Sequence, residues 1–267
     1  MFLKNSWIFL ILFLIFSKTN SNMPSLKTII QNFINFKKDG KIDIPLDIKR
    51  IKLDIGLSYG ANNSQYWLTH EENLMVFGFE PNPECIGSIL QDSEIKLRHE
   101  SHGTPLEKKF VNKNFFLIPC ALGLQSNSMM KFYVTKNDCG CSSIYPPVYF
   151  PVEDIIEVPM FSLSDFFDLF PFDTHPVIEY IKIDAQGSDL DIVKSAGNYL
   201  TERIIYITLE AEIGQYQNAV SSARDIHNYM KSIGFVEYRS SFTDDPTYFN
   251  PRFSGYIKNN PVKIFQR

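Results

Sequence analysis

The sequence predicts an α/β protein with a Rossmann-like, doubly wound sheet of about seven mostly parallel strands and helices on both faces. Two observations predict this class. Short apolar runs typical of buried strands alternate along the chain with amphipathic segments typical of helices. Residues 51–83 also show a strand, a glycine-containing turn, a helix and a second strand in succession, with Asp54 and Glu80 at the ends of the two strands.

Strands are expected where β-branched, aromatic or other apolar residues run together: 51–55, 74–79, 115–118, 129–135, 155–161, 180–183, 204–209, 235–238 and a late one within 256–265. Helices are expected where apolar residues recur at helical spacing: 25–36, 62–70, 83–91, 162–169, 188–199 and 219–233. Pro119 ends the third strand, Ser162 or Ser164 caps a helix, Gly187 permits a sharp turn, and Gly234 ends the last helix.

Length and composition predict one large domain with extensions, because the chain has 267 residues and is 44% apolar. We expect an N-terminal helical extension over 22–50 and the main domain over 51–267. The net charge is −4 and the isoelectric point lies near 5.8. Because the sequence has no basic tract, we expect no nucleic-acid partner.

Residues 1–21 differ from the rest of the chain. Lys4 precedes an unbroken run of ten apolar residues, Trp7–Phe16, and the small residues Thr19 and Ser21 follow. As a helix such a run would span about 15 Å, roughly half a bilayer core. A signal peptide or a short membrane anchor through residues 7–16 fits this pattern, with a buried helix as a third reading. We therefore expect the secretory pathway or a membrane, or the cytoplasm if the segment is not a signal.

Four cysteines, at positions 85, 120, 139 and 141, permit disulfides without requiring them. Cys139 and Cys141 are too close for the usual metal spacing, and the five histidines show no ligand spacing either. We expect no metal site.

In a parallel sheet, function is found at the carboxyl ends of the strands. The predicted strands end at or next to Asp54, Glu80, Ala121–Leu122, Asp184 and Glu210. Glu80 follows Gly60 by 20 residues, a common spacing for an acidic residue that binds ribose hydroxyls. The site is therefore expected to bind a nucleoside-containing cofactor.

The charge of Asp54 favours one such cofactor. The spacing Gly56-x-x-x-Gly60 does not match the dinucleotide pattern, and a carboxylate at this strand tip would repel a pyrophosphate. S-adenosylmethionine instead carries an ammonium and a sulfonium, which a carboxylate attracts. A nucleotide-dependent oxidoreductase is correspondingly disfavoured.

Lys182 lies within a predicted buried strand, where a lysine needs a partner. Asp184 lies two residues later, on the same side of the strand, and Glu210 ends the next strand. Two interpretations remain open: Lys182 forms a structural ion pair with either carboxylate, or it forms a functional pair at the acceptor site. Ser188 or Asp189 would cap the helix that follows.

Five segments in order resemble the FkbM-type S-adenosylmethionine-dependent methyltransferases: LDIGLSYGANNS, GFEPNP, CGCSSI, VPMFSLSDFF and IEYIKIDAQGSDLDIVKSAG. The resemblance covers about residues 51–249 and implies a class I methyltransferase fold. It departs from the family pattern at Gln186-Gly187-Ser188-Asp189, where the family has Glu-Gly-x-Glu, and at Ser164, where the family has Asp.

The resemblance implies that Asp54, Gly56 and Gly60 line the methionine end of the cofactor, with Glu80 at the ribose. The full set of expected cofactor-binding residues is Asp54, Gly56, Ser58, Gly60, Asn62, Glu80, Asn82, Ala121 and Leu122, the last two beside the adenine. Lys182 and Asp184 would face the methyl group or its acceptor.

The expected reaction is O-methylation of a hydroxyl on a small molecule or glycan. Asp184 is the first candidate base, Lys182 orients it, and Glu210 is the second candidate base. The alternative is a catalytically inactive, secreted or membrane-tethered binding protein that keeps the fold, which Gln186 and the N-terminal segment motivate.

Overall fold

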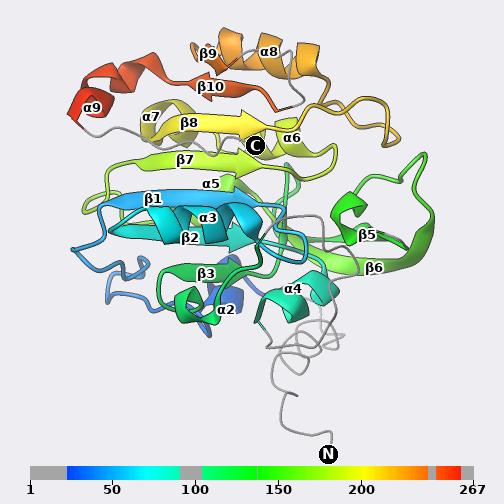
Figure 1. The fold of residues 1–267 in the computed structure, drawn as a ribbon, viewed down its shortest axis with the longest axis horizontal. Helices are drawn as coiled ribbons and strands as arrows, with labels where there is room; N and C mark the ends of the chain where they lie inside the picture. The colour runs from blue at the N-terminus through cyan, green and yellow to red at the C-terminus, as the bar shows by residue number, and fades with distance from the viewer. Residues whose placement is uncertain (1–22, 91–103, 137, 240–244, 260–267) are drawn as a thin grey trace, which may run out of the picture.

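The computed structural model describes residues 23–90, 104–136, 138–239 and 245–259 of the chain. Its centre is a seven-stranded sheet with the order β3-β2-β1-β7-β8-β10-β9 (Figure 1). The strands are β1 (Arg50–Ile55), β2 (Leu74–Phe79), β3 (Phe115–Ile118), β7 (Ile178–Ile183), β8 (Ile204–Leu209), β9 (Val236–Arg239) and β10 (Thr247–Phe249). The first five pair in parallel, and β10 runs antiparallel to both of its neighbours. The predicted doubly wound, mostly parallel sheet is confirmed.

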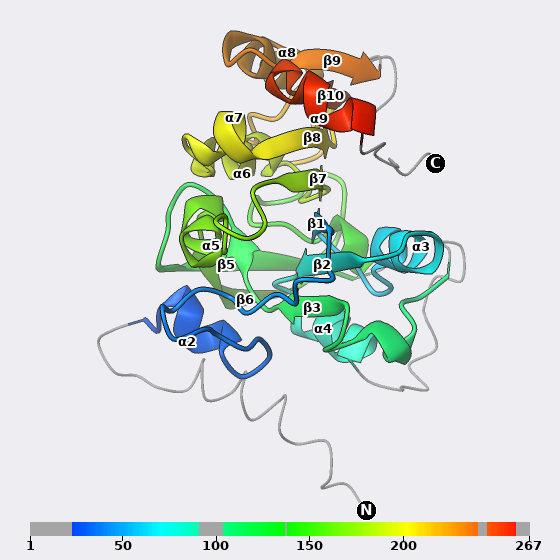
Figure 2. The same ribbon diagram turned by 90° about the vertical axis from the view of Figure 1, so that its left-hand side faces the viewer.

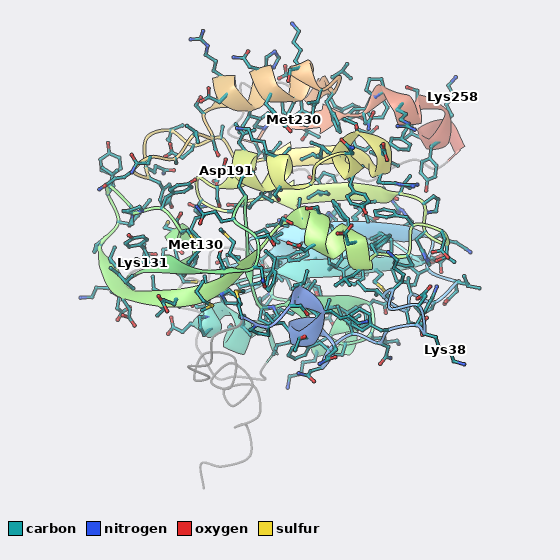
Figure 3. The ribbon with its side chains drawn as sticks, turned by 180° about the vertical axis from the view of Figure 1, so that it is seen from behind. Lys38, Met130, Lys131, Asp191, Met230 and Lys258 are labelled. Carbon is teal, nitrogen blue, oxygen red and sulfur yellow. The ribbon has the colours of Figure 1, made fainter. Side chains whose placement is uncertain are left out.

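Helices cover both faces of this sheet, which Figure 2 shows edge-on. One face carries α2 (Leu26–Ile30), α5 (Leu163–Leu169), α6 (Asp189–Ser195), α7 (Tyr199–Arg203) and α8 (Ala223–Ser232). The other carries α3 (Asn62–His70), α4 (Pro83–Leu90) and α9 (Ser254–Asn259). In Figure 3, Met230 points from α8 toward the first face, where it is fully buried.

Alternation along the strands divides the core between the two faces. In β1, Leu53 and Ile55 join the cluster under α5 and α6, while Lys52 and Asp54 point to the side of α3. Both polar side chains are buried. Lys52, nearer the start of β1, pairs with Glu71, whereas Asp54, next to the end of β1, accepts hydrogen bonds from Ser64.

A second, three-stranded sheet projects beyond the strand ends at the right of Figure 1. It consists of β4 (Ala121–Leu122), β6 (Val152–Phe161) and β5 (Ser128–Thr135), in that order, with β5 antiparallel to β6. The expected strands at 129–135 and 155–161 therefore form an arm outside the main sheet. Short 3-10 turns stand at η1 (Lys108–Phe110), η2 (Cys139–Cys141) and η3 (Pro251–Phe253).

Several predicted helices are shorter in the structure. The helix expected over 25–36 spans only Leu26–Ile30, although its apolar stripe is buried as expected. The helix expected over 188–199 ends at Ser195, because Gly197 adopts a left-handed backbone with φ +56° before α7 begins. The last long helix begins at Ala223, after the N-cap Ser222.

The late strand expected within 256–265 is wrong over the described residues. Ser254–Asn259 is the helix α9, whose Tyr256 and Ile257 pack against the core on the α3 side. The strand in this part of the chain is β10, at Thr247–Phe249, just before the Asn250-Pro251 turn. Residues 260–267 lie outside the described part.

The expected signal or anchor segment, with the run 7–16, also lies outside the described residues. Among the helices that the structure does describe, none combines the length and apolar character needed to cross a bilayer.

Candidate active site

The strand ends carry the predicted site residues to one edge of the sheet. The ends of β1, β2, β7 and β8 lie side by side because the strands are parallel neighbours, and Asp54 pairs in register with Lys182. A pocket of about 860 Å³ opens at this edge. Its size falls within the usual range for ligand sites, about 300–1,000 Å³.

The loop after β1 forms one wall of the pocket. Gly56 has φ +81°, and a Cβ there would lie 1.8 Å from the carbonyl oxygen of Asp184, so no side chain fits. Ser58 and Ala61 also adopt left-handed backbone conformations. Only a tightly bent, glycine-dependent loop can pass this close to the end of β7.

Glu80 holds this loop in place. One carboxylate oxygen accepts hydrogen bonds from the amides of Leu57 and Ser58 at 3.0 and 3.1 Å, and the other accepts from the Asn82 amide at 2.8 Å. Burial outweighs these bonds and raises the pKa of Glu80 to about 7. Glu80 therefore organises the loop and also faces the pocket.

Asp54 lies behind the wall instead of lining the pocket. Its Oδ2 accepts hydrogen bonds from the amide and hydroxyl of Ser64, in the first turn of α3, and its Oδ1 is buried without a hydrogen-bond partner among the described residues. Burial raises the pKa of Asp54 to about 6, against the effect of the Ser64 bonds. Asp54 thus fixes the start of α3 behind the loop.

Four acidic residues surround Lys182 at the ends of β7 and β8. The Lys182 ammonium lies 3.5 Å from a carboxylate oxygen of Asp184 and 3.6 Å from one of Asp245. Burial would lower the pKa of Lys182, but attraction to Asp184, Asp245, Glu210 and Asp189 raises it. Lys182 is therefore firmly charged, and it lies beneath the pocket without lining it.

The acidic residues repel one another in return. Burial, together with the charge of Asp184, raises the pKa of Asp189 to about 7 and lifts the pKa of Glu210 well above its usual range. Asp189 accepts the backbone amides of Ala185 and Glu210, so it links the two strand ends. This acid cluster, defined as Asp184, Asp189, Glu210 and Asp245 around Lys182, has more acidic than basic groups.

Gln186 bridges two of these carboxyl groups. Its side-chain amide donates to Asp184 at 2.8 Å and to Glu210 at 2.6 Å, and its oxygen accepts from the Tyr216 hydroxyl at 2.6 Å. The backbone of Gln186 has φ +53°, a strained conformation for a residue with a side chain. Both polar groups of the Gln186 side chain are thus hydrogen-bonded, and its amide nitrogen holds Asp184 and Glu210 next to each other.

The outer wall of the pocket comes from segments far apart in the sequence. The Val148 amide donates to the Gln215 carbonyl at 2.8 Å, and the Gln217 amide donates to the Pro146 carbonyl at 2.9 Å, so two loops join above Gln186. The Tyr145 hydroxyl donates to Asp191 of α6 at 2.7 Å, and Figure 3 places Asp191 beside these loops. The turn 139–142 also lines the pocket, and we call this turn together with the two loops the roof of the pocket.

Most predicted site residues line the pocket: Gly56, Ser58, Gly60, Asn62, Glu80, Ala121, Leu122, Asp184 and Glu210. Asp54, Asn82 and Lys182 lie one layer behind it. Gln186, which departs from the family pattern, lines the pocket as well. Sequence reasoning missed Phe150 and Gln215, and also Tyr216, which reaches Gln186 from outside; no local pattern marks these loop residues.

The side chains that line the pocket include acidic residues but neither Lys nor Arg among the described residues. The acidic residues are Glu80, Asp138, Asp184 and Glu210. Among the described residues, no group of three or more His, Cys, Asp or Glu side chains is arranged to hold a metal ion.

The family model for the methyltransferase FkbM domain matches residues 54–237, more than half of the chain. The chain belongs to the FkbM methyltransferase family. Searches of curated proteins and of solved structures gave no match. The match begins at Asp54 and covers every predicted site residue, whereas Asp245 and β10 lie beyond it.

The fold of this FkbM protein agrees with that assignment. The sheet has the class I methyltransferase arrangement, with one antiparallel strand, β10, inserted beside β8. The protein is therefore a methyltransferase.

Proposed function

We propose that this methyltransferase uses S-adenosylmethionine and methylates a hydroxyl group on an uncharged or cationic small molecule or glycan. The observation that carries the proposal is the acidic character of the pocket, with four carboxyl groups and no Lys or Arg in its described lining. A positively charged donor is attracted to such a site, whereas the pyrophosphate of a dinucleotide is repelled.

The residues at the pocket suit this cofactor. The glycine-dependent loop would admit the methionine end, Glu80 would accept ribose hydroxyls, and Ala121 with Leu122 would border the adenine. Oδ1 of Asn62 is buried in the pocket wall without a hydrogen-bond partner among the described residues, as a group awaiting a ligand would be. When bound, S-adenosylmethionine supplies a methyl group on a sulfonium, which is a strong electrophile.

Asp184 is the proposed base. Because the raised pKa of Glu210 makes that residue the proton carrier of the pair, Asp184 is the member able to accept the acceptor's proton. Lys182 places a positive charge 3.5 Å behind it, and Gln186 holds both carboxyl groups at fixed positions. Positioning of this kind can supply roughly 7–11 kcal/mol of the barrier.

The same charges restrict the acceptor. A phosphate or carboxylate acceptor would meet the Asp184 carboxylate with no Lys or Arg in the described lining to neutralise it. The lining offers the aromatic ring of Phe150 instead, which packs against the buried Tyr216 ring at 6.1 Å between centroids. An uncharged hydroxyl compound or glycan fits both features, and nucleic acid stays an unexpected partner.

The inactive binding protein is the weaker candidate, because the family match and the retained Asp184–Glu210 pair both favour activity. A membrane tether through residues 7–16 remains a separate proposal that concerns location only.

Transfer of a labelled methyl group tests the acceptor chemistry. The full chain is incubated with methyl-labelled S-adenosylmethionine and fractions of neutral glycans, amines, acids and phosphates. We expect label in the neutral fraction, as a methyl ether that survives alkaline hydrolysis. Label that alkali releases would identify a carboxylate ester instead, and transfer only to phosphates would contradict the charge argument.

A further inference from the structure

Two cysteines that lie far apart in the sequence meet beside the pocket. Cys85, on α4, and Cys139, at the start of the η2 turn, are separated by 54 positions, yet their Sγ atoms lie 2.9 Å apart. Both side chains are buried, with 1% and 5% of their surface exposed. The remaining cysteines, Cys120 and Cys141, are also free thiols.

The pair lies between two parts of the pocket. On one side, α4 begins where the Glu84 amide donates to Asn82, directly after the loop that Glu80 organises. On the other side, Cys139 belongs to the roof turn, and its Sγ lies 3.9 Å from the hydroxyl of Ser58 in the cofactor loop. A bond between the sulfurs would therefore join the roof to α4.

We propose that Cys85 and Cys139 form a disulfide that fixes the roof turn against α4. A disulfide sulfur–sulfur bond is about 2.05 Å long, so the two atoms must approach by less than about 1 Å. The site is independent of the identity of the methyl acceptor.

The oxidation balances with a small disulfide such as oxidised glutathione. One cysteine thiolate attacks it, which forms a mixed disulfide and releases one glutathione. The second cysteine thiolate then attacks the cysteine sulfur of the mixed disulfide and displaces the second glutathione. The two cysteines together lose two protons and two electrons, and the oxidant is recovered as two thiols. Because buried thiols react slowly, the bond should form while the chain folds, before the roof closes over α4.

The bond closes a loop of 54 positions. Because it restricts the unfolded chain, oxidation should raise the melting temperature by roughly 10 °C. A disulfide of this kind persists in oxidising compartments, so its state also reports where the protein resides.

The test uses the full chain refolded with and without oxidised glutathione. Free thiols are alkylated, and the digested protein is mapped by mass spectrometry. We expect a linked peptide that joins Cys85 to Cys139, with Cys120 and Cys141 alkylated, and a melting temperature that falls when reductant is added. Cys120→Ser is the matched control and should keep both results.

Cys85→Ser, Cys139→Ser and the double variant should melt at one temperature with or without reductant, while circular dichroism shows the native fold. Alkylation of Cys85 and Cys139 after oxidative refolding would overturn the proposal. So would a different pairing, or a linked pair whose reduction leaves the melting temperature unchanged.

Discussion

Buried and half-buried charges gather at both ends of the central sheet, and the two groups differ in their numbers of acidic and basic residues. At the strand starts, Arg50 and Lys52 lie against Glu71 and Glu179, with Lys52 2.7 Å from Glu71 and Arg50 2.8 Å from Glu71. At the strand ends, Lys182 faces Asp184, Asp189, Glu210 and Asp245. The first group pairs two cations with two anions; the second has one cation among four acidic residues.

The difference separates a structural role from a functional one. In the strand-start group every charge has an opposite partner, and Lys52 also lies over the Trp67 ring at 4.9 Å. Such a group joins α3 to the sheet and leaves no net charge for a ligand. The acid cluster has an excess of acidic groups beside an open pocket, so it is suited to a cationic ligand and to proton transfer.

Removal of one partner from the balanced group should have the largest effect on stability. Glu71→Ala removes the carboxylate 2.7 Å from the buried Lys52 ammonium and leaves Glu179 at 4.0 Å. We expect the free energy of unfolding to fall by about 3–5 kcal/mol, as for other broken buried pairs. Denaturant unfolding measures it, with the exposed neighbour Glu72→Ala as the control. A loss no greater than that of the control would contradict the structural role.

Removal of the proposed base should mainly affect turnover. Asp184→Asn should keep the fold and lower kcat by about 10²-fold or more. Asp245→Asn is the control, because it removes the other carboxylate beside Lys182 without touching the pocket lining. If Asp184→Asn keeps near-normal turnover, Glu210 becomes the candidate base.

A substitution at Gln186 should have a smaller effect on turnover than the loss of Asp184. Gln186→Glu replaces the amide that donates to Asp184 and Glu210 by a third carboxyl group. The acid cluster should then hold its protons more tightly. In a plot of kcat against pH, the rising limb should therefore move to higher pH by about one unit. Gln215→Glu, at the rim, should leave the limb in place. An unmoved limb in Gln186→Glu would argue against the bridging role.

The buried charges at the two ends of the sheet also predict different pH dependences of stability. Burial raises the pKa of Glu80 and Asp189 to about 7 and of Asp54 to about 6, whereas these groups titrate near pH 4 in the unfolded chain. The folded protein therefore binds more protons between about pH 4 and 7, and its stability falls as the pH rises through this window.

The strand-start group contributes little in that window. Burial lowers the pKa of Lys52 to about 8 despite the attraction of Glu71, so its effect on stability changes only above that pH. We expect the melting temperature without cofactor to drop by a few degrees from about pH 5 to pH 7. Asp189→Asn should flatten the decline, and a melting temperature that rises over this range would contradict the account.

Much of this molecule could be predicted from local patterns. Residues 62–70, 74–79, 115–118 and 204–209 match α3, β2, β3 and β8 because each apolar pattern is continuous and clearly ended. The strand ends could be placed together from the parallel order of the strands, and Glu80, Asp184 and Glu210 line one pocket.

The remainder depends on contacts between distant segments. Tyr216 reaches Gln186 only because two loops pair through Val148 and Gln215, which no local pattern indicates. Asp54 was expected to line the cofactor site, but its commitment to Ser64 places it one layer behind. Strand β10 is three residues long, too short to distinguish from a turn by pattern.

Calorimetric titration of the full chain with S-adenosylmethionine tests the role of the acid excess most directly. A cation entering the pocket lowers the pKa of nearby carboxyl groups, so binding should release protons near pH 7 and should tighten from about pH 6 to pH 8. The measured heat should then depend on the ionisation enthalpy of the buffer, and NAD should not bind. Binding without proton release and equally tight at both pH values, or tighter binding of NAD, would contradict the account.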